Sequence, residues 1–164
     1  MSSTVTAEHF LARSIQLATA NVLNSGGPFG AVIVTAGGQA FDGVNRVTAT
    51  NDPTAHAEVT AIRRACTELG VFELRGATLY TSCEPCPMCL SSALWARVDR
   101  VVYAADRHDA ASVGFDDAAF YEYFENNRPD SVLHVRQLKL QGPEAPPVLQ
   151  PFTTWRNLQT RTDY

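Results

Sequence analysis

No stretch of this sequence approaches the roughly 20 consecutive apolar residues that a transmembrane helix needs, although 45% of its residues are hydrophobic. Its first residues have neither the basic start nor the apolar segment of a secretion signal. The chain has only four cysteines. Two of them lie in one short motif, a pattern that fits reduced thiols better than a disulfide framework. These features predict a cytoplasmic protein that does not enter a membrane.

Positive charge is also scarce. The 13 lysines and arginines are outnumbered by 17 acidic residues, which gives a net charge of −4. The basic residues are scattered, and Arg63-Arg64 is the only adjacent pair. Because a protein that holds a nucleic-acid backbone usually has a basic patch, a polynucleotide substrate is disfavoured and a small molecule is favoured.

The order of expected elements indicates a single α/β domain. Apolar residues recur at helical spacing in some segments, and short apolar or alternating runs between turn residues predict strands. We expect helices over 7–24, 57–69, 85–97 and parts of 110–127, with strands over 31–35, 39–47, 77–81, 100–105 and 132–140. Consecutive strand–helix–strand units predict a layered sheet with helices packed on it.

Two short motifs predict a catalytic zinc site. His56 belongs to His-Ala-Glu, and Cys86 and Cys89 belong to Pro-Cys-Pro-Met-Cys. Together they offer three zinc ligands, which leaves the fourth tetrahedral position open, as in catalytic rather than structural sites. Each motif is expected at a helix start, with Pro85 in the first turn of the second helix, where the helix N-terminus favours a thiolate.

Glu58 is the expected proton carrier. It follows His56 by two residues, so its carboxylate enters the site from another direction and need not bind the metal. Zinc lowers the pKa of bound water to roughly 7, and a nearby carboxylate can take that proton and pass it to a leaving amine. The expected reaction is attack of zinc-hydroxide on an sp² carbon that bears an amino group, followed by loss of ammonia.

A structural zinc knuckle is the alternative to a catalytic site. Cys66 and Cys83 could in principle complete a four-cysteine site. Cys66 lies on the apolar stripe of its helix and is expected to be a packing residue. Cys83 is expected to line the site without ligating.

The two motifs resemble the zinc-binding signature of the cytidine deaminase superfamily. More narrowly, the chain resembles the bacterial guanine deaminases of that superfamily. Besides the motifs, the resemblance rests on Ala105 to Ala111, on Gly114-Phe115-Asp116-Asp117, and on the tail with Trp155-Arg156-Asn157 and Asp163-Tyr164. It covers essentially the whole chain.

The resemblance implies a three-layer α/β/α sandwich around a five-stranded mixed sheet, with one Zn²⁺ per subunit. It implies a homodimer in which residues 150–164 of one subunit are swapped onto the other and close its active site. The implied reaction converts guanine and water to xanthine and ammonia.

The resemblance also implies roles for residues outside the zinc motifs. Phe29 would lie against the purine ring, unless it is simply a core residue at a strand start. Asn45 would hydrogen-bond a ring edge, unless it is only a turn residue. Asp117 would meet the guanine N1–H or amino group and assist proton transfer, although the neighbouring Asp116 is an alternative. Tyr164 of the partner would cap the pocket, and Glu84 would support the backbone of the site.

Two rival functions remain open at this point. One is the same chemistry on another ring, such as cytosine, cytidine, ammeline or adenosine in tRNA. The other is a non-catalytic zinc-binding interaction module. Glu58 disfavours the second, because an inert module does not need a carboxylate at that place.

Overall fold

The computed structural model of the protein describes residues 6–127, 133–138 and 146–163. Four strands form one sheet in the order β2-β1-β3-β4. They are β1 (Gly30–Val34), β2 (Ala40–Val44), β3 (Thr78–Cys83) and β4 (Arg100–Ala105). β1 is antiparallel to both β2 and β3, whereas β3 and β4 are parallel, so the sheet is mixed as expected.

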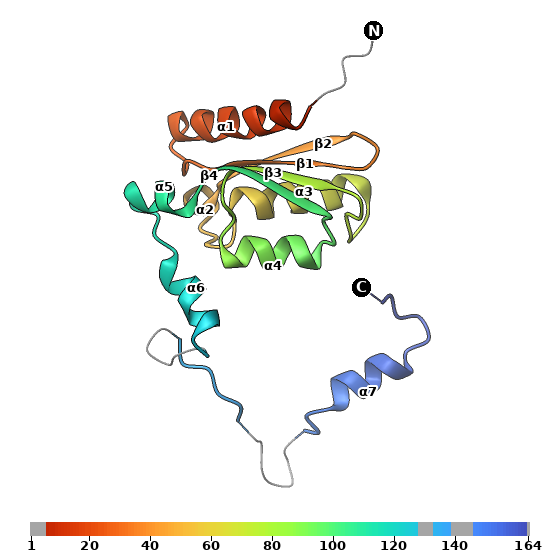
Figure 1. The fold of residues 1–164 in the computed structure, drawn as a ribbon. Coiled ribbons are helices and arrows are strands. Elements are labelled where there is room, and N and C mark those ends of the chain that lie inside the picture. The colour runs from red at the N-terminus through yellow and green to blue at the C-terminus, as the bar shows by residue number, and fades with distance from the viewer. Residues whose placement is uncertain (1–5, 128–132, 139–145, 164) are drawn as a thin grey trace.

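Helices cover both faces of this sheet. α1 (Ala7–Leu23) packs on one face, and α3 (Ala57–Leu69) and α4 (Pro87–Trp95) lie on the other (Figure 1). α3 connects β2 to β3 and α4 connects β3 to β4, which gives the two strand–helix–strand units that the sequence predicts. The expected three-layer α/β/α architecture is therefore confirmed.

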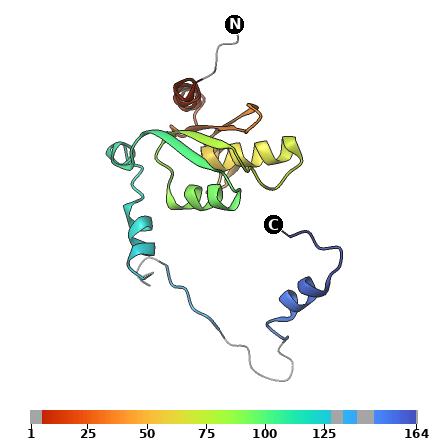
Figure 2. The same ribbon diagram turned by 45° about the vertical axis from the view of Figure 1, so that its right-hand side comes forward.

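The remaining helices are short and lie outside the two main layers. They are α2 (Val47–Thr50), α5 (Arg107–Ser112), α6 (Ala118–Glu125) and α7 (Gln150–Asn157). The segment 110–127 is helical in parts, as expected, because α5 ends at Ser112, before Gly114, and α6 begins at Ala118. Figures 1 and 2 show α7 standing away from the sandwich in both views.

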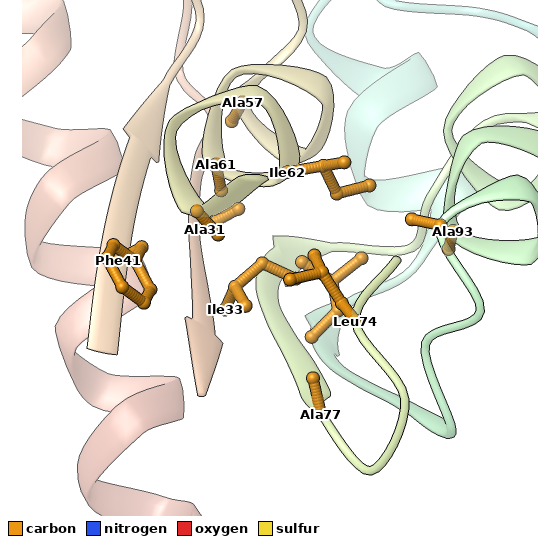
Figure 3. Packing of buried hydrophobic residues seen from close by; sticks show 12 residues of the cluster. Ala31, Ile33, Phe41, Ala57, Ala61, Ile62, Leu74, Ala77 and Ala93 are labelled. Carbon is orange, nitrogen blue, oxygen red and sulfur yellow. The ribbon is translucent and has the colours of Figure 1, made fainter. Parts of the chain in front are cut away.

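The core lies between the sheet and α3. Ala31 and Ile33 of β1 and Phe41 of β2 pack against the buried side of α3, where Ala57 and Ala61 are four residues apart (Figure 3). The helix approaches β2 so closely that a Cβ on Gly43 would lie 2.3 Å from the main-chain oxygen of Ala57. Small residues on both elements thus allow the backbone contact that brings the start of α3 to the end of β2.

Two expectations about strands are corrected. The resemblance implies five strands, but the described residues form four. The fifth was expected over 132–140, where residues 133–138 form no strand and the other three residues lie outside the described ranges. The second expected strand ends at Val44 rather than residue 47, because the chain turns there into α2. No helix within the described ranges has the length and apolar character needed to cross a membrane.

Candidate metal centre and active site

The three expected zinc ligands come together at the starts of two helices. His56 immediately precedes α3, and Cys86 immediately precedes α4. Cys89 lies in the first turn of α4 and is fully buried. The expectation about the helix starts is confirmed, with one correction. The proline in the first turn of α4 is Pro87 and not Pro85, because the helix begins one residue after Cys86.

The spacing of these donors fits zinc. His56 Nδ1 lies 3.7 Å from Cys86 Sγ and 3.5 Å from Cys89 Sγ. Tetrahedral coordination with ordinary Zn–N and Zn–S lengths separates a nitrogen from a sulfur ligand by roughly 3.6 Å. One nitrogen and two sulfurs are a ligand set typical of zinc, and three ligands leave a fourth position for another group.

The two cysteines differ in their affinity for protons. Hydrogen bonding between the Cys86 and Cys89 sulfurs, together with His56, lowers the pKa of Cys86 to about 4. The same hydrogen bond and burial raise the pKa of Cys89. The hydrogen bond with Cys86 also raises the pKa of His56. Cys86 is thus a thiolate at neutral pH, the form that binds a metal ion.

Glu58 is buried beside these ligands. Only 6% of the residue is exposed, and burial is the main reason that its pKa is raised. Its Oε2 lies 3.4 Å from Cys89 Sγ, and its Oε1 accepts a hydrogen bond of 3.3 Å from the Thr81 hydroxyl. The carboxyl group is therefore held in place by β3, while it remains outside the set of three mutually close donor atoms.

A pocket of about 600 Å³ opens over this centre. His56, Glu58 and Cys86 lie in its wall, so a metal ion held by the three donor residues would be reached from the pocket. The wall also contains residues from the loop before β1, from the end of β2, and from α5, α6 and the segment between them, among them Gly27, Phe29, Asn45, Cys83, Glu84, Arg107, Phe115, Asp116, Asp117 and Phe120.

Phe29 and Asn45 both line the pocket. The Phe29 ring packs edge-to-face on Phe115, with 5.0 Å between the ring centroids, and it also contacts the core. Asn45 is almost fully buried, and its Oδ1 accepts a hydrogen bond of 3.2 Å from the main-chain N–H of Val47. Both residues thus combine a structural contact with a position in the pocket wall.

Asp116 and Asp117 both line the pocket, but their surroundings differ. Asp116 Oδ1 accepts a hydrogen bond of 3.0 Å from the main-chain N–H of Ala118, at the start of α6. The pKa of Asp117 is raised, mainly by partial burial and then by the negative charge of Cys86. Tyr164, the expected cap from a partner subunit, lies outside the described residues.

Several supporting contacts have no local signal in the sequence. The Tyr121 hydroxyl of α6 donates a hydrogen bond of 2.7 Å to the main-chain oxygen of Pro85, next to the ligand Cys86. The Arg107 guanidinium lies over the Tyr121 ring and pairs with Glu84 at 3.4 Å. Glu84 also accepts a hydrogen bond from the Arg107 main-chain N–H. These contacts, like the one from Thr81, join residues at least 14 positions apart, which motif spacing cannot reveal.

The other two cysteines are not part of the cluster. Cys66 packs against the hydrophobic core, as expected. Cys83 lines the pocket, and its thiol donates a hydrogen bond of 3.5 Å to the main-chain oxygen of Asp106. Burial raises the pKa of Cys83 to about 11, so this thiol stays protonated at neutral pH.

Known proteins resemble this chain in both sequence and fold. Residues 4–105 match the zinc-binding region of cytidine and deoxycytidylate deaminases. The chain is 48% identical over 158 residues to a guanine deaminase of Bacillus subtilis, covering 96% of this chain and 98% of that protein. The crystal structure of guanine deaminase from Bacillus subtilis superposes with a TM-score of 0.85 and 47% identity, over 97% of this chain and 99% of that one.

A more distant guanine deaminase, from Nitrosomonas europaea, superposes with a TM-score of 0.64 and 32% identity, over 68% of this chain and 65% of that one. The zinc-binding region of the family agrees with the donor set of His56, Cys86 and Cys89. The chain belongs to the cytidine and deoxycytidylate deaminase family of zinc-binding enzymes.

Proposed function

We propose that this protein hydrolyses guanine to xanthine and ammonia. The observation that carries the proposal is the buried Glu58 carboxyl group beside the His56, Cys86 and Cys89 cluster, at the wall of an open pocket. This arrangement suits the removal of an amino group from a ring small enough to enter the pocket. The near full-length similarity to the guanine deaminase of Bacillus subtilis supports guanine as that ring.

In the proposed reaction, the chain's own residues bind the base and move protons. His56, Cys86 and Cys89 would hold zinc, which supplies a Lewis acid that lowers the pKa of a water molecule to roughly 7. Glu58 takes a proton from the attacking water and returns it to the amino group as that group leaves carbon 2 of the purine. Burial raises the pKa of Glu58 above that of an ordinary carboxyl group, which favours its uptake of the proton from water.

Three residues are proposed to bind the purine. Phe29 lies against the face of the ring, backed by Phe115. The main-chain hydrogen bond to Asn45 Oδ1 orients the amide, so its NH₂ group is the donor offered to an acceptor on the ring edge. Asp117 accepts from the N1–H or amino group and assists proton transfer. Its raised pKa supports this choice over Asp116, which already holds the start of α6.

Exchange of each aspartate for asparagine distinguishes the two. The Asp117→Asn variant is expected to lower kcat/KM about 10²-fold, because asparagine cannot exchange a proton. The Asp116→Asn variant keeps a side-chain oxygen for the Ala118 N–H and is expected to change kcat/KM only a few-fold. Steady-state rates of ammonia release measure both effects. The opposite ranking would assign the substrate contact to Asp116.

We also propose a homodimer in which residues 150–164 of one subunit are swapped onto the other. The exposure of α7 supports this proposal, since Leu149 just before it is 65% exposed and Phe152 within it is 71% exposed. Large apolar side chains at such exposure favour a partner surface. In this arrangement Tyr164 arrives from the partner and closes the pocket over the base.

Removal of residues 160–164 tests the proposed closure. The truncated protein is expected to keep its melting temperature and its zinc, because the described part of this tail packs on neither the sheet nor the metal centre. Its kcat/KM is expected to fall about 10²-fold, because an open pocket admits water and positions the base less well. Tyr164→Ala is the matched single-residue variant. Normal turnover in both proteins would exclude a closing role for the tail. This conclusion would hold whether sedimentation shows a monomer or a dimer.

The substrate proposal is tested by ammonia release from a panel of guanine, guanosine, cytosine, cytidine, adenine and ammeline. We expect the highest kcat/KM with guanine. A clear preference for cytidine or adenosine would overturn the guanine assignment and leave the zinc chemistry in place. Release of no ammonia from any of the six would favour a non-catalytic zinc module.

We propose the cytoplasm as the site of action. The proposed zinc site needs Cys86 and Cys89 as thiolates, and their sulfurs lie close together at the start of α4. A reducing compartment keeps such a pair from oxidising. Fractionation of the producing cells, followed by immunodetection, checks this location, and recovery in an exported fraction would contradict it.

A further inference from the structure

Asn21 joins the two chain segments that carry Phe29 and Asn45. Its Nδ2 donates one hydrogen bond to the main-chain oxygen of Gly27 and another to the main-chain oxygen of Asn45, each 2.8 Å long. Asn21 lies on α1 and is not among the residues that line the pocket. One side-chain amide thus uses both of its N–H groups to hold two separate parts of the pocket wall.

Both segments are irregular where Asn21 binds them. The first is the turn between α1 and β1, and the second lies between β2 and α2. A main-chain hydrogen bond of 3.1 Å from the Asn45 N–H to the Phe29 oxygen links them. Gly30 and Val44, which adjoin Phe29 and Asn45, form the last pair of the β1–β2 ladder. Beyond that pair the two segments leave the sheet, and the Asn21 side chain bonds both of them.

The packing around Asn21 leaves little room for adjustment. A Cβ on Gly26 would lie 2.3 Å from Asn21 Nδ2, and a Cβ on Gly27 would lie 3.0 Å from Asn45 Cγ. The two glycines therefore allow the turn to lie directly on the side chains of Asn21 and Asn45. The amide, the turn and the Asn45 segment form one tightly packed unit behind the pocket.

We propose that Asn21 is a positioning residue that sets the separation of Phe29 and Asn45, and with it the affinity of the pocket for a planar base. This inference rests on the proposed function of those two residues. The loss of both N–H donors would leave two carbonyl groups without their partner and let the segments move apart. The metal ligands and Glu58 come from α3 and α4 and would stay in place. The affinity for the base should then fall by a larger factor than kcat.

The test compares two variants that lack the N–H donors of Asn21 with a control variant that keeps them. Asn21→Leu and Asn21→Asp keep the approximate size of the side chain, and asparagine 24 supplies the control. The Asn24 Nδ2 donates to the Ala20 oxygen at the end of α1, and Asn24 is not in the pocket wall, so Asn24→Asp removes a similar hydrogen bond away from the pocket. For each protein we would measure KM and kcat with guanine, the dissociation constant for xanthine by calorimetry, zinc content and melting temperature.

The Asn21 variants are expected to raise KM and the xanthine dissociation constant by on the order of 10- to 100-fold, because small displacements of binding groups have effects of this size. Their kcat should change no more than about 3-fold and their zinc content should stay at one per chain, and Asn24→Asp should match the parent. If KM and xanthine affinity stay unchanged while kcat falls with the folded fraction, Asn21 serves only the fold and the proposal is overturned. Failure of the Asn21→Asp protein to fold would overturn it too.

The same measurements separate this inference from the substrate proposal. Should the parent protein prefer another base of the panel, the guanine assignment fails. The KM and product affinity for that other base then decide the role of Asn21. Should the parent release no ammonia from any base, calorimetry with xanthine still compares the Asn21 variants with their control, and equal affinities, including no binding by all, would overturn the positioning role.

Discussion

Exchange of Glu58 for glutamine is expected to lower the rate of ammonia release by at least about 10³-fold while zinc stays bound. Glutamine has nearly the same shape and can still accept the hydrogen bond from Thr81, but it cannot take up and release a proton. General acid–base catalysis by one positioned group contributes about 10²- to 10⁴-fold. Steady-state kinetics and metal analysis of the same preparation measure the two effects.

The stability of the Glu58→Gln variant provides an internal check. Burial raises the pKa of Glu58, so the contribution of this group to stability is complete at acid pH and is lost as the pH rises through its folded-state pKa. A neutral glutamine avoids this loss, and we expect no fall in melting temperature at pH 7. Glu68→Gln, an exposed exchange on the same helix that breaks a surface ion pair with Arg64, should keep full activity. Full activity of Glu58→Gln would exclude the proton-carrier role.

Removal of one zinc ligand should lower activity about as much as Glu58→Gln does, because the variant loses its zinc. The Cys89→Ser variant is expected to purify with little zinc and to lose at least about 10³-fold in kcat/KM. Removal of zinc from the parent with a chelator should give the same loss, and added zinc should restore activity only in the parent. A zinc ion that binds the native state also adds to the free energy of unfolding, so the melting temperature of the variant should fall as well.

Two other cysteine exchanges serve as controls for the ligand set. Cys66→Ser and Cys83→Ser should both retain one zinc per chain, because neither thiol belongs to the cluster of close donor atoms. Cys66 packs on the core and Cys83 faces a main-chain oxygen. Loss of zinc from Cys83→Ser would identify a fourth ligand and a closed, structural site.

The metal centre was predictable because its determinants are local. His56 and Cys86 each stand directly before a helix, and the turn and proline residues that start those helices are adjacent in sequence. The same local evidence misjudged the end of β2. Val44, Val47 and Thr48 are β-branched and favour a strand, but the Asn45 N–H bonds the Phe29 oxygen and the chain then turns into α2.

The fifth strand illustrates a different limit. Leu133 and Val135 alternate with polar residues, which predicts one apolar face of a strand. An alternating pattern identifies a face but does not supply the neighbouring strand, and in the structure both side chains are more than half exposed. Likewise, the contacts of Thr81, Tyr121 and Asn21 depend on elements brought together by the fold, so no spacing rule could reveal them.

The separation of the metal ligands along the chain links zinc supply to the amount of folded protein. His56 and Cys86 are 30 residues apart, and β3 lies between them in the sequence. A zinc ion that binds His56 and Cys86 in the native state, and does not bind the unfolded chain, acts as a reversible cross-link. At a free zinc concentration 100 times the dissociation constant, it would add about 2.7 kcal/mol to the free energy of unfolding. Cells short of zinc would then degrade more of the newly made chains, and abundance would fall together with activity.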